Sequence, residues 1–564
     1  MPKTVLEFGE WTPDQGPINN QGLWFAKNAI KINDNYENSP LFALTNTAPG
    51  SGAADPLGTH YHVKRAGKPP LMFFGTSDKI YVSEHIDTPV WADASASAYT
   101  ATNWEFASFG PTVVATNGVD AMQGYSVADT FNAATNFASL LVTTSPTTAN
   151  IKPKFIATHK NHIFAANITM AADWPASSPQ FSNGTLYQEL VWWSDTDNAT
   201  RFGDLTNSPT LKNSGWFLLY DRYGAITGLG AGLDTLYAFK NNAIYRCDGS
   251  PFTFSPVAYG TGTAHSKSIK SLDGEVYFWS ETGPCKIGLD GNVERFGQDS
   301  CYRSLIDSLY AKHNAFYNSS GTFSIKRDDG SKVWTAVDAT NKLVLFFIST
   351  ADSDNPLDDG DYANSILVLN AITKKLYYCE AQVYQVGSAV LATIGYPMEA
   401  DIEDGPSEIR KGTAFRGVFG VGQNAAGANV MGHFTYQHIY PENDYVWFEL
   451  PFTRFGDGAS RITKIRPLLS IKSTSAEVEP SYRIKITTRQ QFFPGPGGDT
   501  TPISIDSNGS KAGWIDTGKC PTGITHSIAF GVKNGGVAES TQTMAFRDIS
   551  GIEVEYAVAG VRSA

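Results

Sequence analysis

Residues 513–520, GWIDTGKC, come nearest in this chain to a motif with defined chemistry, the phosphate-binding P-loop. A P-loop needs a hydroxyl residue after its lysine to bind magnesium, followed by a helix whose backbone amides hold the phosphate. Here Cys520 occupies the hydroxyl position, and Pro521 stands where the helix would have to continue. The segment is therefore predicted to be a turn between strands.

Two other patterns point to cofactors or metals, and neither is complete. Residues 228–232, GLGAG, lack the third glycine of a dinucleotide-binding loop and lead into DTLYAF, which is a strand pattern. His60 with His62, and His159 with His162, have no carboxylate or thiol at metal-ligand spacing. We expect ordinary strand and turn histidines at all four positions.

Acidic residues offer the remaining chemistry. The segment 350–362 could bind calcium through its carboxylates, but Pro356 interrupts it and Gly360 is out of register for an EF-hand loop, so a solvated loop is favoured. Its acidic residues are Asp352, Asp354, Asp358, Asp359 and Asp361. No sialidase-type Asp box and no Gly-x-Ser-x-Gly elbow occurs, although carboxylates contributed by separate sheets could still form a glycosidase site. We predict a non-enzyme with no catalytic, cofactor-binding or metal-binding residue.

Composition limits the classes of partner. The 564 residues carry a net charge of −12, and residues 430–564 hold 13 basic and 13 acidic residues, which leaves 30 against 42 in residues 1–429. Such an acidic surface repels phosphate and disfavours nucleic-acid binding by charge neutralisation. The five cysteines show no metal or redox spacing and are expected to be unpaired buried thiols. The start MPKTVLEFGEW predicts no signal peptide, and we expect no stable membrane insertion.

The elements that would position any site are strands. Aromatic content of 12%, with 52 Gly and 29 Pro, is typical of many short strands joined by tight turns. Residues 104–127, WEFASFGPTVVATNGVDAMQGYSV, are interpreted as two strands around a turn at Asn117 and Gly118, with positive φ at both. Similar strand pairs turn near Ser77-Asp78, Lys160-Asn161, Asn241-Asn242, Asp273-Gly274, Asp290-Gly291, 339–341 and 371–373.

The spacing of these turns is close to 40 residues or its double, which is the length of a four-stranded propeller blade. A closed ring also protects the strand edges. We therefore predict an all-β chain in which residues 1–425 form a β-propeller with decorated loops, and residues 1–45 close or brace the ring. A solenoid is the competing architecture.

Two regions depart from the blade pattern. In residues 299–316, apolar side chains recur at helical spacing and predict one amphipathic helix, with His313 as a packing or capping residue in its last turn. Residues 397–411 are acidic and mark the exit from the ring. From about residue 430, alternating strands at sandwich spacing predict a separate β-sandwich or jelly-roll-like domain over 430–564.

Several phrases of the sequence resemble the tail hub or nozzle proteins of short-tailed bacteriophages. They include FGEWTPDQGPINNQGLWFAKNAIKINDNYENSPLFA at 8–43, WEFASFGPTVVATNGVDAMQGYSV at 104–127, VWWSDTDNATRFGD at 191–204 and ISGIEVEYAVAGVRS at 549–563. The likeness extends over 230–249 and 269–291 and keeps the same order along nearly the whole chain. Its opening combines an Ala26 to Asn28 pair, with Lys27 inserted, and a phrase from Asn35-Tyr36 to Pro40.

This resemblance implies a structural virion protein of the tail, assembled in the host cytoplasm. It implies a homo-oligomeric ring, expected to be a hexamer, below the portal and the tail adaptor protein. Such a ring would form the distal channel for transient, non-specific passage of double-stranded DNA and would contact tail fibres or spikes. An acidic propeller lining would repel DNA phosphates and let the genome slide.

Two alternatives from other classes stay open at this stage. A glycan-binding propeller, either adhesin or lectin-like, would use exposed aromatic side chains such as Trp192 and Trp193. A propeller glycosidase is the third interpretation. The Trp-Trp pair occurs once, whereas a lectin propeller would need similar aromatic sets in several blades.

Overall fold

Strands are the dominant secondary structure of the residues that the computed structural model describes. The described residues are 1–12, 15, 22–31, 35–38, 41–47, 57–62, 70–84, 90–128, 131–144, 147–172, 181–202, 213–249, 252–298, 301, 333–339, 341–348, 365–380, 383–384, 392–399, 415–424, 429–435, 446–473, 480–489, 503–508, 514–518, 520–534 and 544–559. The helix predicted over 299–316, with His313, and the acidic segments 350–362 and 400–411 lie outside them.

Six four-stranded antiparallel sheets, which we number as blades, follow one another along the described chain. Blade 1 consists of β6 (Gly58–His62), β7 (Leu71–Gly75), β8 (Ile80–Glu84) and β9 (Ala92–Asp93). Blade 2 consists of β10 (Glu105–Phe109), β11 (Thr112–Thr116), β12 (Gln123–Ser126) and β13 (Ala138–Ser139). Blade 3 consists of β16 (Ile151–His159), β17 (His162–Met170), β18 (Leu186–Trp193) and β19 (Gly215–Leu218). A separate hairpin, β14 (Val142–Thr144) and β15 (Thr147–Ala149), precedes blade 3.

Blades 4 to 6 repeat this order. Blade 4 consists of β20 (Ile226–Ala231), β21 (Leu236–Lys240), β22 (Ala243–Asp248) and β23 (Thr253–Tyr259). Blade 5 consists of β24 (Lys270–Leu272), β25 (Glu275–Ser280), β26 (Gly283–Ile287) and β27 (Val293–Arg295). Blade 6 consists of β28 (Trp334–Asp338), β29 (Leu343–Ile348), β30 (Ser365–Asn370) and β31 (Lys375–Glu380). One short 3-10 helix, η1 (Ser266–Ser268), lies just before β24.

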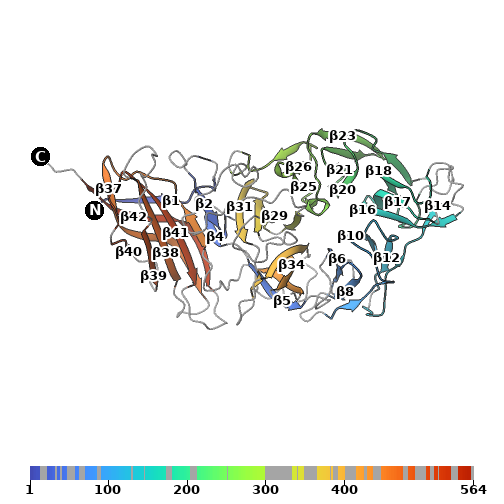
Figure 1. Ribbon diagram of the computed structural model, residues 1–564, viewed down its shortest axis with the longest axis horizontal. Coiled ribbons are helices and arrows are strands. Elements are labelled where there is room, and N and C mark those ends of the chain that lie inside the picture. The colour runs from blue at the N-terminus through green and yellow to red at the C-terminus, as the bar shows by residue number, and fades with distance from the viewer. Residues whose placement is uncertain are drawn as a thin grey trace.

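A closed sheet takes the seventh position of the ring. It consists of β32 (Val383–Tyr384), β33 (Ala392–Glu399), β34 (Phe415–Asn424), β35 (Asn429–Thr435) and β5 (Leu41–Thr47). The first strands of successive blades contact one another from β6 to β28, and β33 contacts both β28 and β6. Because β5 precedes blade 1 in the sequence and pairs with β35, backbone hydrogen bonds close the propeller (Figure 1). The predicted exit from the ring at 397–411 and the predicted sandwich start at 430 are therefore too early, because β34 and β35 still belong to the ring and the sandwich resumes at β36.

Two further sheets pack face to face beside the ring and form the sandwich (Figure 1). The first contains β1 (Lys3–Glu7), β3 (Ala29–Lys31), β4 (Tyr36–Asn38), β42 (Met544–Ala559), β37 (Ala459–Ser473) and β40 (Ile515–Asp516). The second contains β2 (Phe25–Lys27), β36 (Val446–Glu449), β41 (Thr525–Asn534), β38 (Pro480–Arg489) and β39 (Ile503–Asn508). Between the sheets, the ring of Phe448 stacks on Phe8 at 4.4 Å and meets the edge of Tyr36 at 5.3 Å.

The N-terminal segment differs from the expectation that residues 1–45 belong to the propeller. β5 closes the ring, but β1, β2 and β4 pair with strands that lie more than 400 residues later in the sequence, and β3 joins the same sheet by pairing with β4. Their apolar side chains, such as Leu23, Ile30 and Tyr36, are fully buried and complete the core of the sandwich. Hydrophobic burial therefore recruits them to the sandwich.

The predicted turns fall where expected, with one correction. Lys160 and Asn161 both have positive φ between β16 and β17, as do Asp273 and Gly274 between β24 and β25. At Asn117 and Gly118 the prediction of a two-residue turn is wrong, because β11 ends at Thr116 and β12 begins only at Gln123. The Asn117 side chain accepts hydrogen bonds from the amides of Val119 and Asp120, which stabilises a wider loop.

Candidate functional site at the propeller axis

Polar side chains gather on the first strands of the neighbouring blades 1 and 2 and on η1, which precedes blade 5. We call this group the axial cluster, and it consists of His60, His62, Glu105, Ser108 and Lys267. β6 places both histidines on one face, because alternate residues of a strand point to the same side. β10 contributes Glu105 and Ser108, and η1 contributes Lys267.

Ser108 is hydrogen bonded to both imidazoles of the axial cluster. Its Oγ lies 2.8 Å from Nε2 of His60 and 2.9 Å from Nδ1 of His62. A hydroxyl carries one proton, so Ser108 donates to one ring and accepts from the other. A serine beside a histidine is also the arrangement that activates a nucleophile, which makes this the best candidate for chemistry in the described chain.

The electrostatics of the axial cluster do not suit that chemistry. Burial, with smaller contributions from His62, Lys270 and Lys267, lowers the pKa of His60 to about 3. A general base is most effective when its pKa is close to the working pH, so His60 accepts a proton poorly near pH 7. The geometry thus supports a structural hydrogen-bonded group better than a hydrolase centre.

Contacts between η1 and β10 cross the ring axis. Ser266 Oγ donates to Glu105 Oε1 at 2.9 Å, Lys267 Nζ lies 3.2 Å from Glu105 Oε2, and the same ammonium donates to the carbonyl of Trp104. β10 belongs to blade 2 and η1 precedes blade 5, three positions away in a ring of seven. Side chains therefore bridge the axis of a single propeller, and these contacts would obstruct a duplex along it.

This finding bears on the expected acidic lining. Near the axis, His60 senses the positive charges of Lys267 and Lys270, and Glu105 is neutralised by Lys267. Among the described residues, the contacts at the axis pair its carboxylate with a cation, so the expectation of an acidic lining does not hold for this part of the propeller. A DNA conduit would have to lie between copies, and its lining stays a prediction.

The sequence identified part of the axial cluster and missed the rest. His60 and His62 were expected to be ordinary strand residues, and they are hydrogen-bonded strand residues. Ser108 lies 48 residues from His60, and Ser266 lies 161 residues from Glu105. At such separations no local pattern signals the contact, because the blades bring these residues together only when the ring closes.

The other candidates from the sequence are structural. Trp192 is fully buried and Trp193 nearly so, which contradicts their expected exposure and removes the observation behind a lectin. Ile515 and Asp516 of the P-loop-like segment form β40, and GLGAG lies in β20 and the turn after it. His159 and His162 pair across the β16–β17 hairpin.

The cysteines and the other possible metal ligands of the described segments form no metal site. All five cysteines are free and buried, in agreement with the prediction, and burial raises the pKa of Cys247 to about 12. Within the residues that the structure describes, no three His, Cys, Asp or Glu side chains gather as a metal site would require. In the same residues no helix has the length and apolar character to cross a bilayer.

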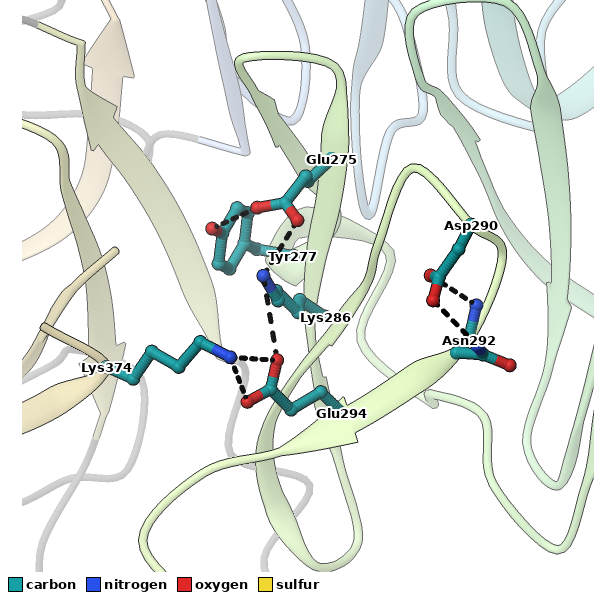
Figure 2. A network of polar contacts seen from close by, with 7 residues as sticks. All are labelled: Glu275, Tyr277, Lys286, Asp290, Asn292, Glu294 and Lys374. Carbon is teal, nitrogen blue, oxygen red and sulfur yellow. Dashed lines mark hydrogen bonds and ion pairs between the residues drawn. The ribbon is translucent and has the colours of Figure 1, made fainter. Parts of the chain in front are cut away.

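A second polar network joins blades 5 and 6 (Figure 2). Lys286 Nζ lies 2.7 Å from Glu275 Oε1 and 3.6 Å from Glu294 Oε2, and Glu294 also pairs with Lys374 at 2.7 Å. The hydroxyl of Tyr277 donates to Glu275 at 2.9 Å. Two cations therefore balance two carboxylates, and the network links neighbouring blades.

No protein-family model matches the chain, and no curated protein matches it. Among solved structures, the WD40 domain of Toxoplasma gondii coronin is 11% identical, with a TM-score of 0.36, covering 75% of this chain and 89% of that one. The WD40 propeller of Doa1 is 7% identical, with a TM-score of 0.37 and 70% and 97% coverage.

The β-propeller domain of Myceliophteria thermophila Cps50 (Swd1) is 9% identical, with a TM-score of 0.38 and coverage of 70% of this chain and 99% of that one. These identities are too low to transfer a function. The sheet order and the ring of contacts are what define the architecture of this chain. It is an all-β protein with a β-propeller fold.

Proposed function

We propose that this protein is a structural subunit of the tail nozzle or hub of a short-tailed bacteriophage. In this proposal, six copies form a ring below the portal and adaptor, support fibres or spikes, and enclose the distal DNA channel. The proposal takes its identity from the sequence resemblance. Its mechanical part rests on the junction between the propeller and the sandwich.

That junction is the observation that carries the proposal. The backbone amide of Asn28, in the sandwich, donates to the carbonyl of Tyr378 in blade 6 at 3.0 Å. Tyr36 meets the edge of Tyr377 at 6.1 Å, and Lys375 pairs with Glu10 at 2.7 Å. One continuous apolar core includes buried residues of blade 6 and of both sandwich sheets. A unit joined in this way can serve as a rigid wall segment.

The bridged axis adds a geometric condition to the proposal. Since side chains bridge the axis of one propeller, the proposed conduit lies between subunits, as a ring of copies would provide. The acidic charge of residues 1–429 favours a wall that does not retain DNA, because like charges repel the phosphates. The proposed role is thus passive guidance of DNA without catalysis.

Electron microscopy and sedimentation of the purified protein test this proposal. We expect rings with an open centre in negative stain and a sedimenting species of about six protomers. A monomer at all concentrations would contradict the proposal, and binding of that monomer to an oligosaccharide array would favour the lectin alternative instead.

A further inference from the structure

The two ends of blade 4 carry exposed side chains of complementary character. Its strands are antiparallel neighbours in the order β20-β21-β22-β23. The β20–β21 turn therefore lies at one end of the sheet, whereas the segment before β20 and the end of β23 lie at the other. Two surfaces of one blade consequently face in opposite directions along its strands.

Aromatic and cationic groups occupy the end formed by the segment before β20 and the end of β23. We call Tyr220, Arg222, Tyr223 and Tyr259 the Tyr–Arg cluster. Tyr223 stacks on Tyr259 with ring centroids 5.1 Å apart, and the guanidinium of Arg222 lies 5.2 Å from the Tyr223 centroid. Tyr220 is 87% exposed and Tyr259 is 56% exposed. Tyrosine and arginine are the residue types that dominate the energetic centres of protein interfaces.

A buried ion pair supports the Tyr–Arg cluster from below. Lys240, which is fully buried, donates to Asp221 Oδ1 at 2.8 Å and to the carbonyl of Leu219 at 2.6 Å. Asp221 also accepts hydrogen bonds from the Tyr245 hydroxyl and from the backbone amide of Tyr223. These contacts fix the backbone under the Tyr–Arg cluster before any partner binds, which reduces the conformational entropy lost on binding.

Arg222 is left as the free charge of this surface. Its hydrogen-bond partner is aromatic, since it donates to the Tyr223 hydroxyl at 3.1 Å, and no carboxylate among the described residues pairs with it. The negative charge of the adjacent Asp221 is already balanced by Lys240. The chemistry that fits this surface is therefore a carboxylate beside apolar side chains.

The other end supplies that chemistry. We call Leu233 and Asp234, from the β20–β21 turn, together with Leu289 and Asp290, from the β26–β27 turn of the neighbouring blade 5, the Leu–Asp cluster. Both leucines are 69% exposed and meet over Gly274, where an added Cβ would lie 2.7 Å from Leu233 Cβ and 3.3 Å from Leu289 Cδ2. An exposed aspartate follows each leucine. Hydrogen bonds from Asn292 hold the pKa of Asp290 below its usual range, so this carboxylate is charged.

We propose that the Tyr–Arg cluster of one copy docks on the Leu–Asp cluster of a second copy of this chain. In this contact the guanidinium of Arg222 faces the two carboxylates, and the tyrosine rings cover the leucines. A contact between two different surfaces of identical chains is heterologous and closes into a ring when the rotation between copies permits. The inference rests on the proposed ring assembly and names the surfaces that build it.

Charge reversal in the full-length protein tests the docking, with sedimentation velocity over a range of concentrations as the readout. Arg222→Glu is expected to weaken self-association at least about tenfold, because it places like charges together. Adding Asp234→Arg and Asp290→Arg to that variant recreates the opposite charges and is expected to restore the ring. Arg454→Glu is the control, since this exposed sandwich arginine bonds the Asp457 carbonyl and undergoes the same charge change.

The outcomes separate the two proposals. Rings of the wild type that Arg222→Glu leaves intact would overturn the docking but leave the ring assembly standing. A wild type that stays monomeric would overturn both. Failure of the triple variant to assemble, with its melting temperature unchanged, would also overturn the docking, as would an equal loss of assembly in Arg454→Glu.

Discussion

The strands that pair in a propeller blade are close together in the sequence, whereas many strands that pair in the sandwich are far apart. Each of the six blades uses four consecutive strands, so its sheet is complete within one stretch of chain. The sandwich joins β1 to β4 with β36 to β42, and its sheets span almost the whole chain. A repeat with local pairing is visible in a sequence, whereas a sheet assembled from both ends of the chain is not.

Among the changes considered, removal of the N-terminal strands should cause the largest loss of stability, and the loss should fall on the sandwich. Residues 430–564 alone are expected to remain unfolded, because β1 to β4 contribute buried Leu23, Ile30 and Tyr36 to their core. The same fragment linked to residues 1–38 is expected to melt cooperatively, as followed by near-UV circular dichroism. A cooperative melt of 430–564 without the added segment would contradict the shared sandwich.

Acid should affect the propeller axis more strongly than the sandwich. The folded pKa of His60, about 3, is below the unfolded value near 6.5, so the stability from neutral His60 is complete above pH 6.5 and is lost as pH falls toward 3. The loss is on the order of a few kcal/mol. Urea unfolding at pH 7 and pH 4.5 should show a smaller acid effect in His60→Gln.

His526 is the matched histidine in the sandwich. Burial lowers its pKa, but hydrogen bonds with Ser460 and Gly523 act in the opposite direction, and no cation contributes to the shift. His526→Gln should therefore reduce the acid-induced loss of unfolding free energy less than His60→Gln does. Equal pH profiles for the two variants would show that the cations at the axis have no effect on His60.

The ion-pair network between blades should give the smallest effect. Lys286→Met leaves Glu275 and Glu294 close together without their shared cation, and is expected to reduce the free energy of unfolding by about 1–2 kcal/mol in thermal denaturation. Lys374→Met is the control, because the side chain of Lys374 is 52% exposed and solvent screens its pairing. A larger loss for Lys374→Met would reverse this ranking.

The sequence was sufficient to predict those parts of the fold that depend on contacts between residues close together in the chain. The turns at Lys160-Asn161 and Asp273-Gly274 were predicted because hairpins form between adjacent residues. At Asn117 the same reasoning failed, since its side chain bonds nearby amides and widens the loop. The Ser108 contacts and the pairing of β1 with β42 could not be predicted, because ring closure and core burial create them.

The pairing of β1, β2 and β4 with strands near the end of the chain has a consequence for synthesis on the ribosome. Residue 38 emerges about 400 residues before β36 begins, which at ordinary translation speeds is a wait of roughly 20 to 80 s. During that wait Leu23 and Ile30 have no sandwich core to enter. Nascent chains should thus be most exposed to chaperones and to misfolding at their beginning, and become protected there only when the final strands arrive.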